Sequence, residues 1–316
     1  MRALAGSVWR WLAGALILVL VVRQVGSGPV LDGLRALDAG VLLLGAVLAL
    51  VTTVASAWRW TLVARELDVA ITLPRAVASC YRAQLLNTVL PGGVLGDVHR
   101  GVVHGRSAGS TGRALRAVGW ERFAGQVVQA VVAALVLSVL PSPVRPAVPW
   151  LLGASAVLAA FAVVALRRTP HRDAWWSRAA RTVRDDVRLA LLVRRSWPGV
   201  VLASVVTTVG YAATLVVAAR AVGVSASLAT LLPLALVVLV AAGLPLNVAG
   251  WGPREGMAAW AFGAAGLGAS AGMAAAVAYG AIVLVANLPG LVVLAATRRT
   301  TSVPATGAPA GEPAHA

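Results

Sequence analysis

The chain has 316 residues, of which 59% are hydrophobic and only 12% are charged, and its mean hydropathy is +0.84. Soluble domains carry about a quarter charged residues, and several apolar runs here approach the ~20 residues that cross a bilayer. The composition excludes a soluble two-domain protein and predicts an all-α integral membrane protein.

The formal net charge is +16, and all 27 basic residues are arginine. Basic residues of membrane proteins gather on the cytoplasmic side and meet anionic lipid, so this charge does not require nucleic acid. We expect no nucleic-acid partner. Cys80 is the single cysteine, which excludes an intrachain disulfide.

The first apolar run follows two arginines, Arg2 and Arg10. The residues after it carry a charge and lack an A-x-A cleavage site, which favours an uncleaved first span over a signal peptide. The predicted spans, in chain order, are 8–25, 39–58, 114–140, 147–166, 199–221, 228–246 and 271–296. Two weaker apolar stretches lie at 74–90 and 256–268.

Charge between the spans predicts their orientation. Region 59–113 carries seven arginines, and region 167–198 carries nine arginines against three aspartates, so both are expected in the cytoplasm. The short loops 26–38, 141–146 and 222–227 contain few arginines and are expected outside. The N-terminus is then cytoplasmic. Seven full spans would put the tail 297–316 outside, but Arg298 and Arg299 favour the cytoplasm, and an internal repeat resolves this by making one segment re-entrant. The tail is predicted to be disordered.

Two Gly-rich breaks suggest an internal repeat. Asn87 and Asn247 each precede a break, and they are 160 positions apart. The same shift lays 39–58 on 199–218, and these two segments run in opposite directions across the membrane. Inverted halves of this kind are common in transporters. The residues assigned to the breaks are Asn87, Pro91, Gly92, Gly93, Gly96, Asn247, Gly250, Gly252 and Gly256.

The repeat predicts six to eight transmembrane helices with two broken or re-entrant segments. Whether 228–246 spans fully or re-enters is left open. The predicted divisions are a first membrane half at 1–166 with a re-entrant segment at 74–106, a cytoplasmic loop at 167–198, a second half at 199–296 with a broken segment at 228–268, and the tail.

Three acid–base groups interrupt apolar sequence: Asp97 with Arg100, Glu121 with Arg122, and Arg254 with Glu255. A charge in the bilayer costs roughly 2.5–3.5 kcal/mol on insertion scales, so each group is expected to have a structural or functional role. Arginine binds phosphate through paired hydrogen bonds, and helix N-termini attract anions.

We therefore assign Arg100, Arg122 and Arg254 to a lipid headgroup, with Asp97, Glu121 and Glu255 orienting them or relaying protons. The alternative is that these groups are ion pairs that set helix register, with glycines four apart at each break as packing faces. The asparagines are expected to cap the broken helices or to join neighbouring helices. Three further arginines are expected to snorkel at the interface: Arg59, Arg65 and Arg82.

Apparent catalytic and metal motifs lack the context that they require. Two G-x-S-x-G matches, at 105–109 and 268–272, have no strand before the serine. His99 and His104 are five residues apart, which is off the spacing of a helical metal site. We predict no metal, no cofactor and no enzymatic activity.

The loop 167–198 is predicted to form an amphipathic helix. Arg178, Arg181, Arg184 and Arg188 share one helical face, and apolar residues lie mostly on another. Such a helix is expected to lie on the inner leaflet against anionic lipid, although a solvated linker helix has the same pattern.

The stretches LPGGVLGDVHRG and LPLNVAGWGPREG, with Glu121–Arg122 between them, resemble a known family. They are similar to the transmembrane region of lysylphosphatidylglycerol synthases, the flippase portion of the multiple peptide resistance factor, and its stand-alone relatives. The resemblance covers about 8–296. Trp251 and Pro253 depart from the commoner form of the second stretch.

The resemblance implies a bacterial inner membrane protein that moves lipids or lipid-linked headgroups between leaflets. The family's aminoacyltransferase domain would follow this region, and the chain stops at Ala316 after a short tail. The hypothesis is a flippase for an anionic phospholipid or a polyprenyl-linked lipid. The alternatives are an integral membrane transferase acting on a lipid-linked sugar and a scaffold that recruits a lipid-modifying enzyme through the basic loop.

Overall fold

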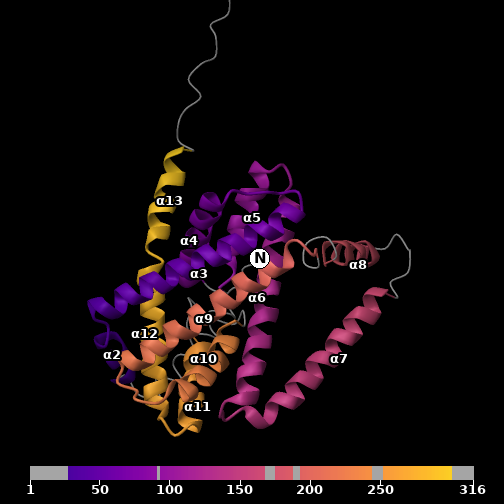
Figure 1. Cartoon of the computed structure of the whole chain (residues 1–316). Helices are drawn as coiled ribbons and strands as arrows, with labels where there is room; N and C mark the ends of the chain where they lie inside the picture. Colours follow the sequence, from indigo (N-terminus) through magenta and orange to yellow (C-terminus); the bar gives the residue numbers. More distant parts are fainter. Residues whose placement is uncertain (1–27, 91–92, 168–174, 188–192, 244–251, 301–316) are drawn as a thin grey trace, which may run out of the picture.

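The computed structural model describes residues 28–90, 93–167, 175–187, 193–243 and 252–300. Every regular element within these ranges is a helix (Figure 1). The predicted all-α class is therefore confirmed, and the long apolar helices identify a membrane protein.

Four helices in the described ranges are long and apolar enough to cross a membrane. They are α3 (Ala39–Glu66), α6 (Thr111–Val139), α9 (Trp197–Ala221) and the α12–α13 stretch Ala269–Ala296. Helix α7 (Val148–Arg167) has 20 residues, and α10 (Leu228–Ala242) has 15. The first predicted span lies outside the described residues, so the total of six to eight spans stays a prediction.

Within the last of these spans the structure differs from the predicted continuous segment 271–296. Helix α12 (Ala269–Ala286) is capped by Asn287, and α13 (Pro289–Thr300) begins two residues after the cap. Pro289 has no N–H to continue the backbone ladder, and this explains the interruption. A second difference is α2 (Gly28–Arg35), a short helix in the predicted loop 26–38.

The order of helices repeats between the two halves. In the first half, α3 is followed by α4 (Leu73–Val89), α5 (Leu95–Ser107) and α6; in the second, α9 is followed by α10, α11 (Pro253–Ala264) and α12. Helices α9, α11 and α12 each begin 158 residues after their counterparts, at 197, 253 and 269 against 39, 95 and 111. Figure 1 shows α6 and α12 running in opposite directions. The predicted shift of 160 residues agrees with this order.

The first break joins α4 to α5 through close backbone contact. A Cβ at Gly96 would lie 2.0 Å from the Ala83 carbonyl oxygen, so only glycine fits. The Asn87 side chain on α4 accepts a hydrogen bond of 2.7 Å from the Gly96 N–H in the first turn of α5. Asn87 thus caps α5, as predicted, and also joins the two helices. Pro91 and Gly92 lie outside the described residues, and Gly93 has φ +61°.

The second break lies mostly outside the described residues, as do Asn247 and Gly250. Its described end is Gly252, the N-cap of α11, with φ +124°. This backbone conformation favours glycine. The Gly256 N–H donates to the Gly252 carbonyl at 3.0 Å, which closes the first turn of α11.

Helices α7 and α8 (Trp175–Asp186) lie at the periphery (Figure 1). Helix α7 diverges from α6 and exposes Trp150 and Phe161. Helix α8 forms where the amphipathic helix was predicted. Its Asp186 carboxylate accepts hydrogen bonds of 2.8 Å from both Arg116 and Trp120 of α6, which ties α8 to a membrane span.

Candidate functional site

Glu121 of α6 lies at the centre of a buried ion-pair network. Its Oε1 accepts from Arg59 Nε at 2.8 Å and Nη2 at 2.5 Å, and its Oε2 accepts from Arg100 Nη2 at 2.6 Å. Glu121 is 1% exposed. The carboxylate therefore joins α3, α5 and α6 from a position that is almost fully buried.

Asp97 forms the second anionic position of the network. Its Oδ1 accepts from Arg100 Nε at 2.9 Å, and its Oδ2 accepts from Asn87 Nδ2 at 2.7 Å and from Arg122 Nη2. The side chain of Arg122 is 43% exposed, whereas that of Arg100 is 4% exposed. Arg122 is thus the most accessible cation of this network.

The network holds three arginines against two carboxylates: Arg59, Arg100 and Arg122 against Asp97 and Glu121. With these groups ionised it carries one excess positive charge. An uncompensated charge in a buried site costs several kcal/mol. The excess charge is most accessible at Arg122, because the other two guanidinium groups are enclosed.

Neighbouring side chains hold the two enclosed arginines in place. Arg59 Nη1 donates to Ser204 Oγ at 3.1 Å and to Thr207 Oγ1 at 3.3 Å, both on α9. The Arg100 guanidinium lies 4.6 Å from the ring centroid of Trp60, a cation–π contact, and its Nη1 donates to Cys80 Sγ at 3.3 Å. These contacts leave little freedom for either arginine.

Arg254 and Glu255 form a second, separate group at the start of α11. Glu255 accepts from the Gly252 N–H at 2.7 Å, and therefore caps the helix, and from Arg254 Nε at 2.8 Å. The Arg254 guanidinium lies 5.1 Å from the Tyr279 ring centroid. A Cβ at Gly280 would lie 2.5 Å from Arg254 Nη2, so a glycine is needed for this arrangement.

Two cavities adjoin these groups. The larger, which we call the chamber, has a volume of about 240 Å³ and is lined by Arg254 and Tyr279 among others. The smaller has a volume of about 120 Å³ and is lined by the whole ion-pair network. Three residues line both cavities: Gln84, Arg122 and Tyr211. Arg122 therefore faces the chamber from the edge of the network.

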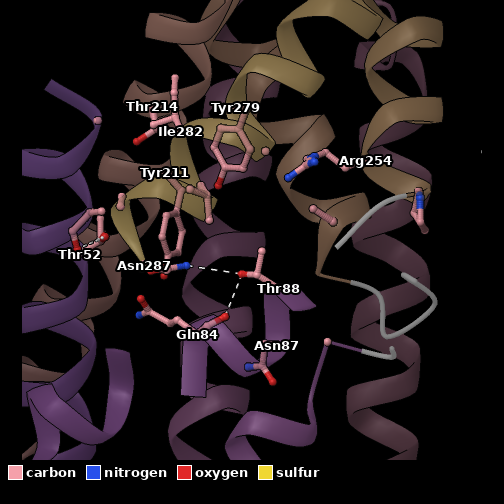
Figure 2. Close-up of a pocket in the computed structure, with 18 of the residues that line it drawn as sticks. Thr52, Gln84, Asn87, Thr88, Tyr211, Thr214, Arg254, Tyr279, Ile282 and Asn287 are labelled. Carbon is pink, nitrogen blue, oxygen red and sulfur yellow. Dashed lines mark hydrogen bonds between the residues drawn. The ribbon is translucent and has the colours of Figure 1, made fainter. Parts of the chain in front are cut away.

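Figure 2 shows how the chamber is lined. Arg254 and Tyr279 point into it from one side, and Gln84, Thr88 and Asn287 lie on the opposite side. Asn287 Nδ2 lies 3.5 Å from Thr88 Oγ1, and this contact joins the second half of the chain to the first. The chamber thus lies between the two halves.

The structure brings together four of the six charged residues predicted for the site: Asp97, Arg100, Glu121 and Arg122. It places Arg254 on the chamber, separate from the network, and pairs it with Glu255, which does not line the chamber. The roles assigned to these residues, headgroup contact and proton relay, stay predictions.

Ion pairs in the network form both within and between the predicted acid–base groups: Arg100 pairs with Asp97 of its own group, and also with Glu121. Glu121 pairs with Arg59 and Arg100 and not with the neighbouring Arg122, whose guanidinium reaches Asp97 instead. Arg59 and Arg82 are buried and do not snorkel at the interface, whereas the Arg65 side chain is 50% exposed. Arg59 was missed because its partner is 62 residues away.

These observations define a class: a helical membrane protein of two similarly ordered halves with a polar, arginine-lined chamber between them. Residues 5–290 match the family model described as the lysylphosphatidylglycerol synthase TM region. The match covers most of the chain, and the protein belongs to this family. A comparison with curated proteins found no match.

Proposed function

We propose that this protein moves an anionic lipid between the two leaflets, with the headgroup passing through the chamber while the acyl chains stay in the bilayer. The observation that carries this proposal is Arg122. Its half-exposed guanidinium belongs to a network with one excess positive charge and faces the chamber. A lipid phosphate supplies the missing negative charge.

The depth of the site supports passage of a headgroup. Arg122 lies about 16 Å along α6 from Thr111, at 1.5 Å per residue. Helix α6 has 29 residues and is long and apolar enough to cross a membrane, and we propose that Arg122 lies within the part of α6 that the bilayer surrounds. A polar cavity at this depth has no role in an inert membrane anchor, and ionisable groups there typically mark a substrate pathway.

The contacts between the halves support alternating exposure of the chamber. Two of them lie at the long limit of a hydrogen bond: Asn287 Nδ2 to Thr88 Oγ1 and Gln126 Nε2 to the Gly243 carbonyl, both at 3.5 Å. We propose that these weak contacts are exchanged when one half moves against the other, while the Arg59 bonds to Ser204 and Thr207 of α9, at 3.1 and 3.3 Å, are kept. Transporters with inverted halves expose a central site in this way.

We place the protein in the bacterial inner membrane with both termini in the cytoplasm, and we propose a carrier and not an enzyme. Its proposed partners are therefore lipids: the transported lipid in the chamber and anionic inner-leaflet lipid at α8. We propose no cofactor and no nucleic-acid partner.

The test is lipid translocation by the purified chain in proteoliposomes, measured with a fluorescent anionic lipid and an external quencher. Arg122→Gln should lower the rate by about tenfold, the effect of losing one charge-assisted hydrogen bond. Arg113→Gln is the matched control, because Arg113 lies on the same helix, has a side chain that is 45% exposed, and contacts Asp68 and Ser110 away from both cavities. Equal rates for the two variants would refute the proposal.

A further inference from the structure

The lining of the chamber points to the chemical class of the headgroup. We infer that it is an uncharged, hydroxyl-rich unit, such as glycerol, inositol or a single sugar, joined to its lipid through one phosphodiester. This inference rests on the proposed function and narrows it to one class of lipid.

The charge of the network sets the charge of the ligand. Its single excess positive charge is balanced by one negative charge, which is what a phosphodiester carries. A phosphate monoester carries about −1.5 to −2 at neutral pH and would leave the site negative. The site therefore favours a phosphodiester over a phosphate monoester.

The positions of the carboxylates also limit which charged headgroups the chamber can hold. The residues that line the chamber include Arg122 and Arg254 but no Asp or Glu among those that the structure describes. Asp97 and Glu121, in the smaller cavity, each already accept hydrogen bonds from two arginines. An ammonium group in the chamber would have two guanidinium groups nearby and no carboxylate partner. Headgroups that carry an amine are therefore disfavoured.

The remaining polar groups of the chamber suit hydroxyls. Gln84 and Asn287 are amides, Thr88 is an alcohol, and Tyr211 and Tyr279 are phenols, all facing the same cavity (Figure 2). Amides and alcohols both donate and accept hydrogen bonds, as hydroxyl groups do. Tyrosine adds an apolar ring face with a polar tip, which matches the alternating C–H and O–H groups of a polyol. The lining thus complements a polyol better than an ion.

The experiment compares headgroups on one lipid anchor. Diacyl lipids with the same labelled acyl chain would carry phosphoglycerol, phosphoinositol, phosphoethanolamine or a phosphate monoester. A polyprenyl phosphate monosaccharide, which is also a polyol phosphodiester, would test a polyprenyl anchor in place of the diacyl anchor. We expect at least about tenfold faster movement of the polyol phosphodiesters, since an unpaired buried charge costs more than 1.4 kcal/mol. Equal or faster movement of phosphoethanolamine or the monoester would overturn the inference.

Two outcomes separate this inference from the proposed function. If no lipid moves, the proposed function fails. If lipids move without preference for a polyol, only the inference fails. Movement of the diacyl or the polyprenyl polyol phosphodiester supports the inference and identifies the anchor.

A charge-gain variant tests the preference against amine headgroups from the side of the protein. Gln84→Glu places a carboxylate at the junction of the two cavities, where Gln84 Oε1 accepts from Thr53 at 3.1 Å and a carboxylate oxygen can do the same. We expect the ratio of phosphoglycerol to phosphoethanolamine movement to fall about tenfold, because the new carboxylate pairs with the amine, whereas its repulsion of the phosphate is common to both lipids. Gln84→Met, which removes the amide and adds no charge, should slow the polyols without favouring the amine. An unchanged ratio in Gln84→Glu, with a normal melting curve, would overturn the inference.

Discussion

Arg59 and Glu121 are 62 residues apart in the sequence, and the Arg59 guanidinium donates two hydrogen bonds, of 2.8 and 2.5 Å, to one Glu121 oxygen. This pair joins the first described span to α6, and Arg100 completes it from α5. The carboxylate of Glu121 thus separates two buried guanidinium groups that would otherwise repel each other.

We expect Glu121→Gln to destabilise the fold strongly. Loss of the carboxylate leaves Arg59 and Arg100 buried without their shared anion, and breaking a buried pair in this way typically costs about 3–5 kcal/mol. The measurement is the apparent melting temperature in detergent. The double variant Arg59→Gln/Glu121→Gln should recover part of the loss, because one of the two unpaired charges is gone. A single variant as stable as the parent would show that the pair does not form.

Gly280→Ala should lower lipid translocation while leaving expression unchanged. The added Cβ would lie 2.5 Å from Arg254 Nη2 and would displace the guanidinium that faces the chamber. We expect a decrease of severalfold to about tenfold, the usual effect of misplacing one charge-assisted contact. The control is Gly119→Ala, where the added Cβ meets no atom within 4 Å. If both variants transport alike, Arg254 does not contact the headgroup.

Arg82→Met should stabilise the protein. Arg82 is 4% exposed, and its Nε has no hydrogen-bond partner among the residues that the structure describes. Replacing this buried donor by an apolar side chain of similar length removes its desolvation cost, which is about 1–3 kcal/mol for an unsatisfied buried polar group. Arg75→Met, at an exposed position on the same helix, should leave the melting temperature nearly unchanged. A lower melting temperature for Arg82→Met would show that the guanidinium has a stabilising partner.

Asp186→Asn should loosen α8. The carboxylate of Asp186 accepts from Arg116 Nε and Trp120 Nε1, both at 2.8 Å, and these bonds hold α8 against α6. An amide oxygen is a weaker acceptor for a guanidinium than a carboxylate, so hydrogen exchange across Trp175–Asp186 should become faster. Asp185→Asn is the control, because Asp185 is the adjacent, exposed aspartate. Equal exchange in the two variants would place the attachment of α8 elsewhere.

The predicted elements and the observed helices agree where periodicity and composition decide the structure. The spans 39–58, 114–140 and 199–221 all lie within or close to described helices, because a membrane requires long apolar runs with internal hydrogen bonds. The breaks were also predictable, since Pro and Gly disfavour a continuous helix. The short helix at Gly28–Arg35 and the interruption before Pro289 were not predicted, because local signals of one or two turns are weak.

The sequence by itself determined the membrane class, the two breaks, the repeat and the identity of the charged residues. All of these depend on composition and on spacing along one chain. Only the tertiary structure decided the pairs between helices: Glu121 with Arg59 and Arg100, and Arg122 with Asp97. The local pairs Asp97–Arg100 and Arg254–Glu255 follow from spacing along the chain, whereas the pairs between helices depend on which helix faces meet. For the same reason the chamber, with its amides, hydroxyls and tyrosines from both halves, is visible only in the folded chain.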